Sequence, residues 1–172
     1  MENQTKFSKL IIYLTCVFFT IFIGSYLVKI GMINQFFEAE TMSIKPIFEG
    51  VELKGAFLTM LPVFSISVIS FICFILFLLA YVVVSKINFR NEGWFFIITL
   101  LIIVTTPFEL YLLLQYDINL IQKIFSNDIN SIYLLEMLKQ RIVALGPFPL
   151  IILFSYFIII FLAIFKPLRK RI

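Results

Sequence analysis

One acidic side chain lies inside a long apolar stretch of this chain, and it is the residue with the clearest potential for chemistry. Glu109 closes a short polar interruption that begins at Thr105, within an apolar run over residues 94–114. Because burying an ionisable group among apolar residues is costly, such a residue is by default a candidate functional site. A buried carboxyl group can bind and release a proton, or it can hold a neighbouring cation.

Two lysines are the expected partners of Glu109. A helix rises about 1.5 Å per residue, which places Glu109 about 22 Å and Lys29 about 28 Å from the same side of the expected helices. Lys29 is therefore within reach of Glu109, and Lys54 is the alternative partner. Thr105, four residues earlier, and Tyr116, seven residues later, are expected on the same helix face. This set predicts a structural ion pair, a proton or ion site, or a contact with a partner protein.

Other kinds of chemistry find little support in the sequence. The chain has no histidine, which is the commonest zinc and haem ligand and the usual acid–base group near neutral pH. Its two cysteines, Cys16 and Cys73, lie in different apolar runs at different expected depths, so we expect two free thiols. No glycine-rich phosphate loop, nucleophile elbow or paired-histidine motif occurs. We expect no catalysis, no cofactor and no metal.

Four apolar runs must position these residues. They cover residues 10–30, 57–84, 94–114 and 148–165. About 20 helical residues cross the hydrocarbon core of a bilayer, and a backbone without water must satisfy its own hydrogen bonds, which favours helices. The composition agrees, since 62% of the residues are hydrophobic and 14% are charged. The sequence predicts an all-α integral membrane protein, with residues 1–172 forming a single domain of four transmembrane helices.

The distribution of basic residues predicts the topology. Eight of the 14 lysines and arginines fall on the side that holds both termini if the chain crosses four times. They are Lys6, Lys9, Lys86, Arg90, Lys166, Arg169, Lys170 and Arg171. Since basic residues are enriched on the cytoplasmic side, both termini are expected there. A bacterial inner (plasma) membrane is the first expectation. The net charge of +4 comes from helix ends rather than from one basic face, so we expect no nucleic-acid partner.

The second of the two longer loops contains a helical pattern over residues 131–145. Its apolar residues recur at steps of three and four, whereas Glu136, Lys139 and Gln140 fall on another face. The apolar positions are Ile132, Leu135, Leu138, Ile142 and Leu145. Asp128 or Asn130 is expected to cap its start. Because the segment is short for a span, it predicts an amphipathic helix at the extracytoplasmic membrane surface.

Two further features concern helix shape and packing. Cys16, Thr20 and Gly24 follow one another at steps of four and form a ridge of small side chains. Such ridges let helices approach closely, so we expect contact with another helix of this chain or with a partner protein. Pro107 cannot donate a hydrogen bond to the carbonyl group of Ile103, so it is expected to kink the third helix.

The sequence favours a non-catalytic role. Its loops are too small to fold as separate domains, and enzyme motifs are missing. The first hypothesis is an accessory or assembly subunit that contacts the lipid bilayer and other membrane protein subunits, or forms a homo-oligomer. An ion or proton pathway that uses Glu109 is the alternative. Immunity proteins against pore-forming bacteriocins share the plan of four spans with both ends inside, so immunity is a third possibility.

Overall fold

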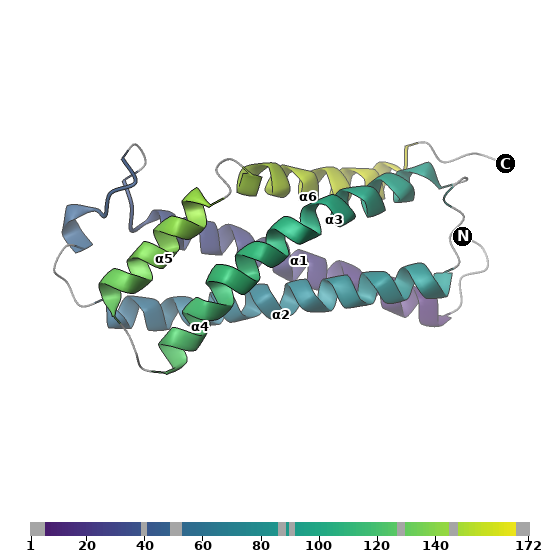
Figure 1. The fold of residues 1–172 in the computed structure, drawn as a ribbon. Helices are drawn as coiled ribbons and strands as arrows, with labels where there is room; N and C mark the ends of the chain where they lie inside the picture. Colours follow the sequence, from purple (N-terminus) through teal and green to yellow (C-terminus); the bar gives the residue numbers. More distant parts are fainter. Residues whose placement is uncertain are drawn as a thin grey trace.

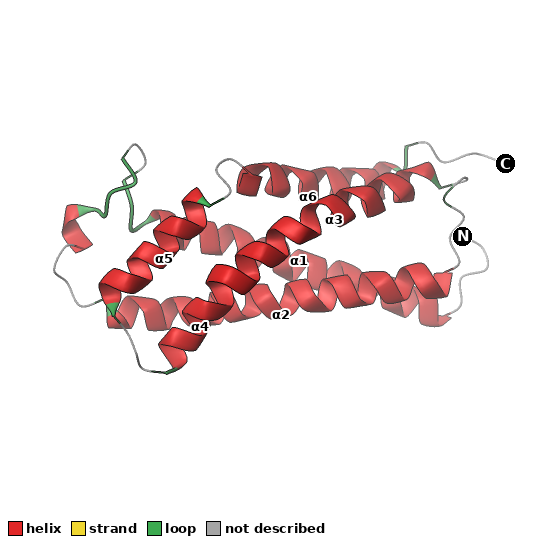
Figure 2. Cartoon of the chain, in the orientation of Figure 1, coloured by secondary structure: helices red, strands yellow, loops and turns green. Residues whose placement is uncertain are grey.

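The computed structural model describes residues 6–38, 41–48, 53–85, 89, 92–126, 130–144 and 148–167. Over these residues the regular structure is helical, joined by short turns and loops, and an isolated β-bridge links Phe37 to Ile44 (Figure 2). The elements in chain order are α1 (Lys6–Asn34), η1 (Pro46–Phe48), α2 (Lys54–Ser85), α3 (Gly93–Leu112), η2 (Leu113–Asp117), α4 (Ile118–Phe125), α5 (Ser131–Val143) and α6 (Phe148–Phe165).

Four helices are long and apolar enough to cross a membrane, as the sequence predicts. They are α1, α2, the unbroken helix Gly93–Phe125 and α6, with 29, 32, 33 and 18 residues. The third is longer than the predicted run over residues 94–114, because α3 continues through the π-helical turn η2 into α4. Asp117 was expected in the second outer loop, and it lies on this helix instead.

The four helices run side by side as an elongated bundle (Figure 1). The principal contacts are those of α1 with α2 and of α3 with α6. The start of α1 and the end of α6 lie at the same end of the bundle, whereas η1 and α5 lie at the other. Both ends of the described chain thus lie at one end of the bundle, as expected for four long helices that alternate in direction.

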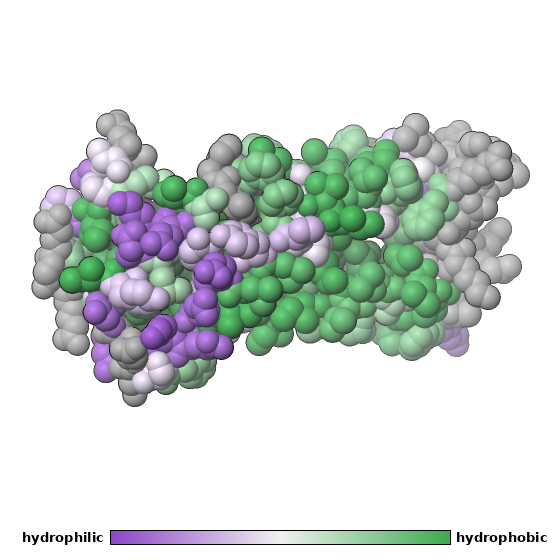
Figure 3. Space-filling view, viewed as in Figure 1, coloured by the Kyte–Doolittle hydropathy of each residue, from purple (hydrophilic) through white to green (hydrophobic). Residues whose placement is uncertain are grey.

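Aromatic side chains dominate the larger part of the core. The ring of Phe22 lies 5.0 Å from that of Phe71 and 5.4 Å from that of Tyr156, measured between ring centroids. A second apolar cluster lies beneath α5 and includes Phe57, Phe64 and Leu134. Outside the bundle, many large apolar side chains are exposed. On the face shown in Figure 3 they cover the middle of the molecule, and hydrophilic side chains gather at the end formed by α4 and α5.

Helix α5 begins where the sequence predicts, and its predicted apolar face is confirmed at Leu135 and Leu138 but not at Ile132. The side chain of Asn130 accepts hydrogen bonds from the backbone of Ile132 at 3.1 Å and Tyr133 at 3.2 Å, so it caps the helix. Ile132, expected on the apolar face, is 78% exposed. Leu134 and Arg141 are buried instead. The placing of α5 at a membrane surface stays a prediction.

The ridge of small residues faces away from the bundle. Cys16 and Thr20 are exposed, and a side chain added at Gly24 would meet nothing within 4 Å. The ridge is therefore not covered by another described helix, contrary to the interpretation as a contact within the chain. Both cysteines are free thiols. Pro107 lies inside α3, and the kink expected there stays a prediction.

Part of the predicted topology depends on residues outside the described ranges. Lys86, Arg90 and the basic residues at 169–171 lie there, as do Asp128 and Leu145. Lys6 and Lys9 on α1 and Lys166 after α6 are described, and they lie at the shared end of the bundle.

Candidate functional site: a buried ion cluster

Asp117 is the centre of a cluster of charged side chains inside the bundle. Its carboxylate accepts a hydrogen bond from Lys29 Nζ on α1 at 2.7 Å. From α5, Arg141 donates to the same carboxylate through Nε at 2.6 Å and through Nη2 at 3.3 Å. Lys29 and Asp117 are fully buried and Arg141 is nearly so. Charged groups away from water are stable only when paired and hydrogen-bonded, and this geometry meets that requirement.

Lys29 joins three helices at this point. Besides Asp117, its ammonium group donates to Ser67 Oγ on α2 at 3.0 Å. It also lies over two aromatic rings, 5.2 Å from the centroid of Tyr26 and 5.7 Å from that of Phe64. A cation over a ring face is attracted by the electron density of the ring. Lys29 is thus surrounded by acceptors and ring faces rather than by water.

Glu109 is also fully buried, but it is bonded differently. Within the described part of the chain, neither of its carboxyl oxygens has a hydrogen-bond partner. It lies close enough to Lys29, Arg141 and Asp117 to interact with their charges. Burying a carboxylate without hydrogen bonds is costly unless nearby cations compensate or a proton neutralises it. Glu109 is therefore the member of the cluster whose charge is least fixed by its contacts.

With Lys29, Arg141 and Asp117 all charged, the cluster is neutral when Glu109 is ionised. Lys29 and Arg141 supply two positive charges, and Asp117 supplies one negative charge. An ionised Glu109 brings the sum to zero, and a protonated Glu109 leaves one positive charge. Proton binding at Glu109 thus changes the net charge of a group of fully or nearly fully buried side chains, among which charges interact strongly.

Arg141 keeps its charge throughout. Burial disfavours the charged guanidinium, but the neighbouring Asp117 carboxylate outweighs burial and raises the pKa of Arg141. Two of its nitrogens contact one carboxylate, an arrangement that the planar guanidinium allows. Arg141 is therefore a permanent positive charge on the α5 side of the cluster.

The predicted site residues are only partly gathered here. Lys29 lies near Glu109 but is hydrogen-bonded to Asp117 and Ser67. Thr105 is buried on the Glu109 helix, and its hydroxyl donates to the carbonyl of Leu101 at 3.0 Å. Lys54 is exposed at the start of α2, away from the cluster. Tyr116 is half-buried and packs against Tyr111, with 6.1 Å between ring centroids.

Sequence reasoning missed Asp117 and Arg141. A regular helix places the residue seven after Glu109 on its face, which is Tyr116. The π-helical turn η2 takes up one additional residue, so Asp117 occupies that position. Arg141 follows Leu134 by seven residues and Leu138 by three, and this spacing on the buried face was a signal in the sequence.

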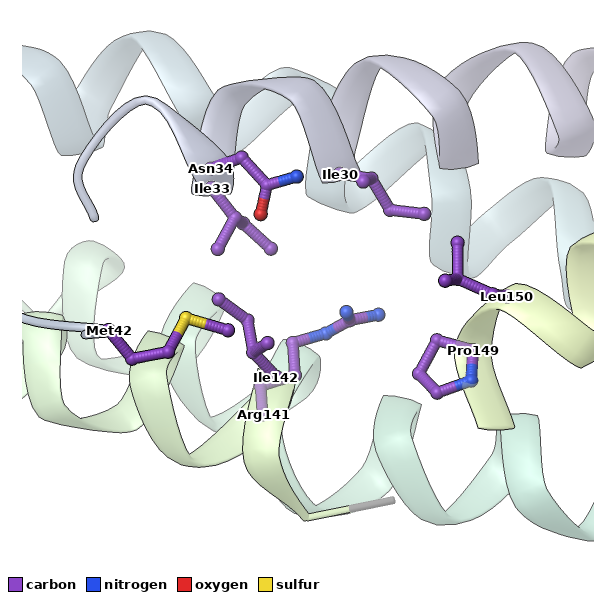
Figure 4. A pocket seen from close by; sticks show the side chains of 8 residues that line it. All are labelled: Ile30, Ile33, Asn34, Met42, Arg141, Ile142, Pro149 and Leu150. Carbon is purple, nitrogen blue, oxygen red and sulfur yellow. The ribbon is translucent and has the colours of Figure 1, made fainter. Parts of the chain in front are cut away.

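A pocket opens beside the cluster where α1, α5 and α6 meet (Figure 4). Its volume is about 260 Å³. It is lined by Ile30, Ile33, Asn34, Met42, Arg141, Ile142, Pro149 and Leu150. The guanidinium of Arg141 extends into this space from α5. Among the described residues, no group of three or more acidic or cysteine side chains could hold a metal ion.

Comparisons with protein-family models, curated proteins and solved structures found no match to this chain.

Proposed function

We propose that this chain is an integral membrane protein that crosses the bilayer four times and binds a proton at Glu109 as part of an ion or proton pathway. Both termini then face the cytoplasm, and α5 lies at the opposite surface. The observation that carries the proposal is the buried carboxyl group of Glu109, which has no hydrogen-bond partner in the described chain.

The bundle has the length and surface that insertion requires. Four helices have apolar windows with a mean hydropathy of 2.2 to 2.9. Large apolar side chains such as Ile103 and Phe154, each 66% exposed, project outward rather than into the core. Soluble proteins rarely expose so much contiguous apolar surface. Lipid is the solvent that suits such a surface, and the shared end of α1 and α6 carries Lys6, Lys9 and Lys166 toward the cytoplasm.

A purely structural role accounts for Asp117 better than for Glu109. Asp117 connects α1 and α5 to its own helix through direct hydrogen bonds. Glu109 makes no such bond, yet it occupies a fully buried position where an apolar residue would cost less. A carboxyl group retained there is explained by a change of charge, which is how proton relays in membranes use acidic residues.

Access to Glu109 is asymmetric. The pocket beside Arg141 approaches the cluster from the α5 end of the bundle. Toward the other end, the apolar core that includes Phe71, Phe74 and Ile102 fills the bundle. A proton that crosses fully therefore requires a change in helix packing. We propose that the resting state opens to the extracytoplasmic side.

Proton flux into reconstituted vesicles tests this function. The wild-type protein is expected to acidify vesicles that contain a pH-sensitive dye when a pH gradient is imposed, and Glu109→Gln is expected to abolish this flux. Glu136→Gln is the matched control, because Glu136 is an exposed glutamate on α5. Both variants must elute as the wild type does on gel filtration. A wild type without flux, or a Glu109→Gln variant that retains it, would overturn the proposal.

The exposed ridge on α1 favours a second candidate role, that of an accessory or assembly subunit. Cys16, Thr20 and Gly24 offer a surface for close helix contact that the described chain does not cover. Native mass spectrometry after extraction in mild detergent tests this role. We expect a complex or homo-oligomer that Gly24→Leu disrupts, whereas a monomer in both cases would contradict it.

A further inference from the structure

The pocket beside the ion cluster has mostly apolar walls and one cation. Ile30, Ile33, Met42 and Leu150 contribute apolar surface, and Arg141 contributes a permanent positive charge. Pockets for drug-sized ligands measure about 300–1,000 Å³. At about 260 Å³ this one suits a smaller molecule. Its lining favours a ligand with a short apolar body and a single negative charge.

The guanidinium of Arg141 has bonding capacity left for such a ligand. Its Nε and Nη2 atoms contact Asp117, and no hydrogen bond joins its Nη1 atom to another described residue. The residue is only 3% exposed, and its guanidinium extends into the pocket between Ile30 and Pro149. The amide of Asn34 lies on the opposite wall. A carboxylate in this space can accept hydrogen bonds from the guanidinium, and the Asn34 amide is a further donor in the pocket wall.

The charge of the cluster links this pocket to Glu109. Several groups face Glu109: Tyr26 and Lys29 from α1, Asp117 on its own helix, Arg141 from α5 and Tyr156 from α6. Asp117 is held ionised by its two cations, so Glu109 is the acid whose charge can change. A protonated Glu109 leaves the cluster with one positive charge, which an anion in the pocket would balance.

We propose that the pocket binds a short-chain monocarboxylate and that its binding favours protonation of Glu109, so that anion and proton bind together. This inference rests on the proposed proton site and names the ligand class that accompanies the proton. The carboxylate takes over the charge-balancing role of ionised Glu109. Because coupling between two sites is reciprocal, a bound carboxylate strengthens proton binding as much as the proton strengthens carboxylate binding.

Isothermal titration calorimetry of the full chain in an uncharged detergent tests the site, with sodium hexanoate as the probe. Hexanoate is expected to bind, and hexylammonium, with the same chain and the opposite charge, is not. Affinity should rise as the pH falls from about 8 to about 6, where hexanoate stays ionised, by up to about tenfold per pH unit for one linked proton. Glu109→Gln should retain binding and lose this pH dependence.

A substitution in the pocket distinguishes hexanoate binding at this site from nonspecific uptake of hexanoate by detergent. Leu150→Trp should fill the pocket and weaken hexanoate binding by about tenfold or more, since overpacking a site excludes its ligand. Ile151→Trp, on the next residue of α6 and outside the pocket lining, should bind as the wild type does. Leu150 and Ile151 are 55% and 53% exposed, so neither substitution is expected to unfold the bundle.

Several results would overturn the inference. These are no hexanoate binding by the wild type, equal binding of hexylammonium, equal binding by Leu150→Trp, or unchanged pH dependence in Glu109→Gln. A phospholipid that native mass spectrometry finds on the wild type but not on Leu150→Trp would also overturn it, because a lipid would then be the occupant. Proton flux without hexanoate binding removes this inference alone. Hexanoate binding linked to Glu109 without proton flux removes the pathway and leaves the site.

Discussion

Glu109 and Asp117 are eight residues apart on one unbroken helix, and both side chains are buried in the same ion cluster. A regular helix brings residues seven apart onto one face. The π-helical turn η2 lies between these two carboxyl groups, and in it the backbone N–H of Ile118 donates to the carbonyl of Leu113, five residues earlier. The wide turn takes up one residue and turns Asp117, rather than Tyr116, toward Lys29 and Arg141.

Deleting one residue from the wide turn tests this relationship. Leu114 is 61% exposed within η2, and its removal should convert the turn to a regular one while Asp117 keeps its face. We expect the free energy of unfolding to change by about 1 kcal/mol or less. Deleting Val104, which is also exposed and lies before Glu109, should rotate Glu109 and Thr105 out of register and cost several times more. Circular dichroism during denaturant unfolding compares them, and equal losses would contradict the relationship.

Removing one charged residue of the cluster should lower the free energy of unfolding more than replacing Lys29, Asp117 and Arg141 together. Lys29→Met leaves Asp117 with one cation and Ser67 without its bond to Nζ, which should lower the free energy of unfolding by about 3–5 kcal/mol. The triple variant Lys29→Met, Asp117→Leu, Arg141→Met replaces the paired charges by apolar groups and should lose far less. Unfolding in mixed detergent micelles measures both. A triple variant less stable than the single one would show that the cluster itself stabilises the fold.

Substitutions in the aromatic core should lower the stability of the protein more than substitutions on its outer surface. Phe22 is fully buried among the rings of Tyr26, Phe71 and Tyr156, so Phe22→Ala should cost about 3–5 kcal/mol. Phe157 on α6 is 47% exposed, and Phe157→Ala should cost little, because lipid or detergent replaces the lost contacts. Thermal unfolding of the two purified variants provides the comparison. Similar losses would mean that α6 is packed differently in the membrane.

The start of α5 should depend on its cap. Asn130→Ala removes the acceptor for the backbone N–H groups of Ile132 and Tyr133, at a cost of about 1 kcal/mol. Asn130→Asp keeps an acceptor at the same place and serves as the control. Without its cap the helix should open more readily, so Asn130→Ala should also speed amide hydrogen exchange over residues 131–143. Exchange rates equal to those of the wild type would contradict the capping role.

Length and hydropathy were sufficient to predict the four long helices, because a helix that crosses lipid must be apolar over its whole length. The end of the third helix was placed too early, at Leu114. The tract from Gln115 to Phe125 contains polar residues, so hydropathy falls while the helix continues. Hydropathy records what surrounds a helix, and it does not show where the backbone hydrogen bonds end.

The site was predictable in part. Glu109 and Lys29 stood out because each is charged within or beside an apolar run. The pairing of Lys29 with Asp117 depends on the wide turn, which leaves no clear mark in side-chain spacing. The charge of Arg141 indicated only that residues 131–145 do not form a fifth span, although its spacing from Leu134 and Leu138 places it on the buried face. Its burial depends on Asp117, which lies on another helix and pairs with it.

Infrared difference spectroscopy of the reconstituted protein tests most directly whether Glu109 binds a proton inside the bundle. Spectra recorded in acidic and alkaline buffer should differ by a carbonyl band of a protonated, water-excluded carboxyl group. We expect that band in the wild type and in Glu136→Gln, and we expect it to be absent from Glu109→Gln. A band that persists in Glu109→Gln, or a wild type without one across the range in which it stays folded, would contradict proton binding at Glu109.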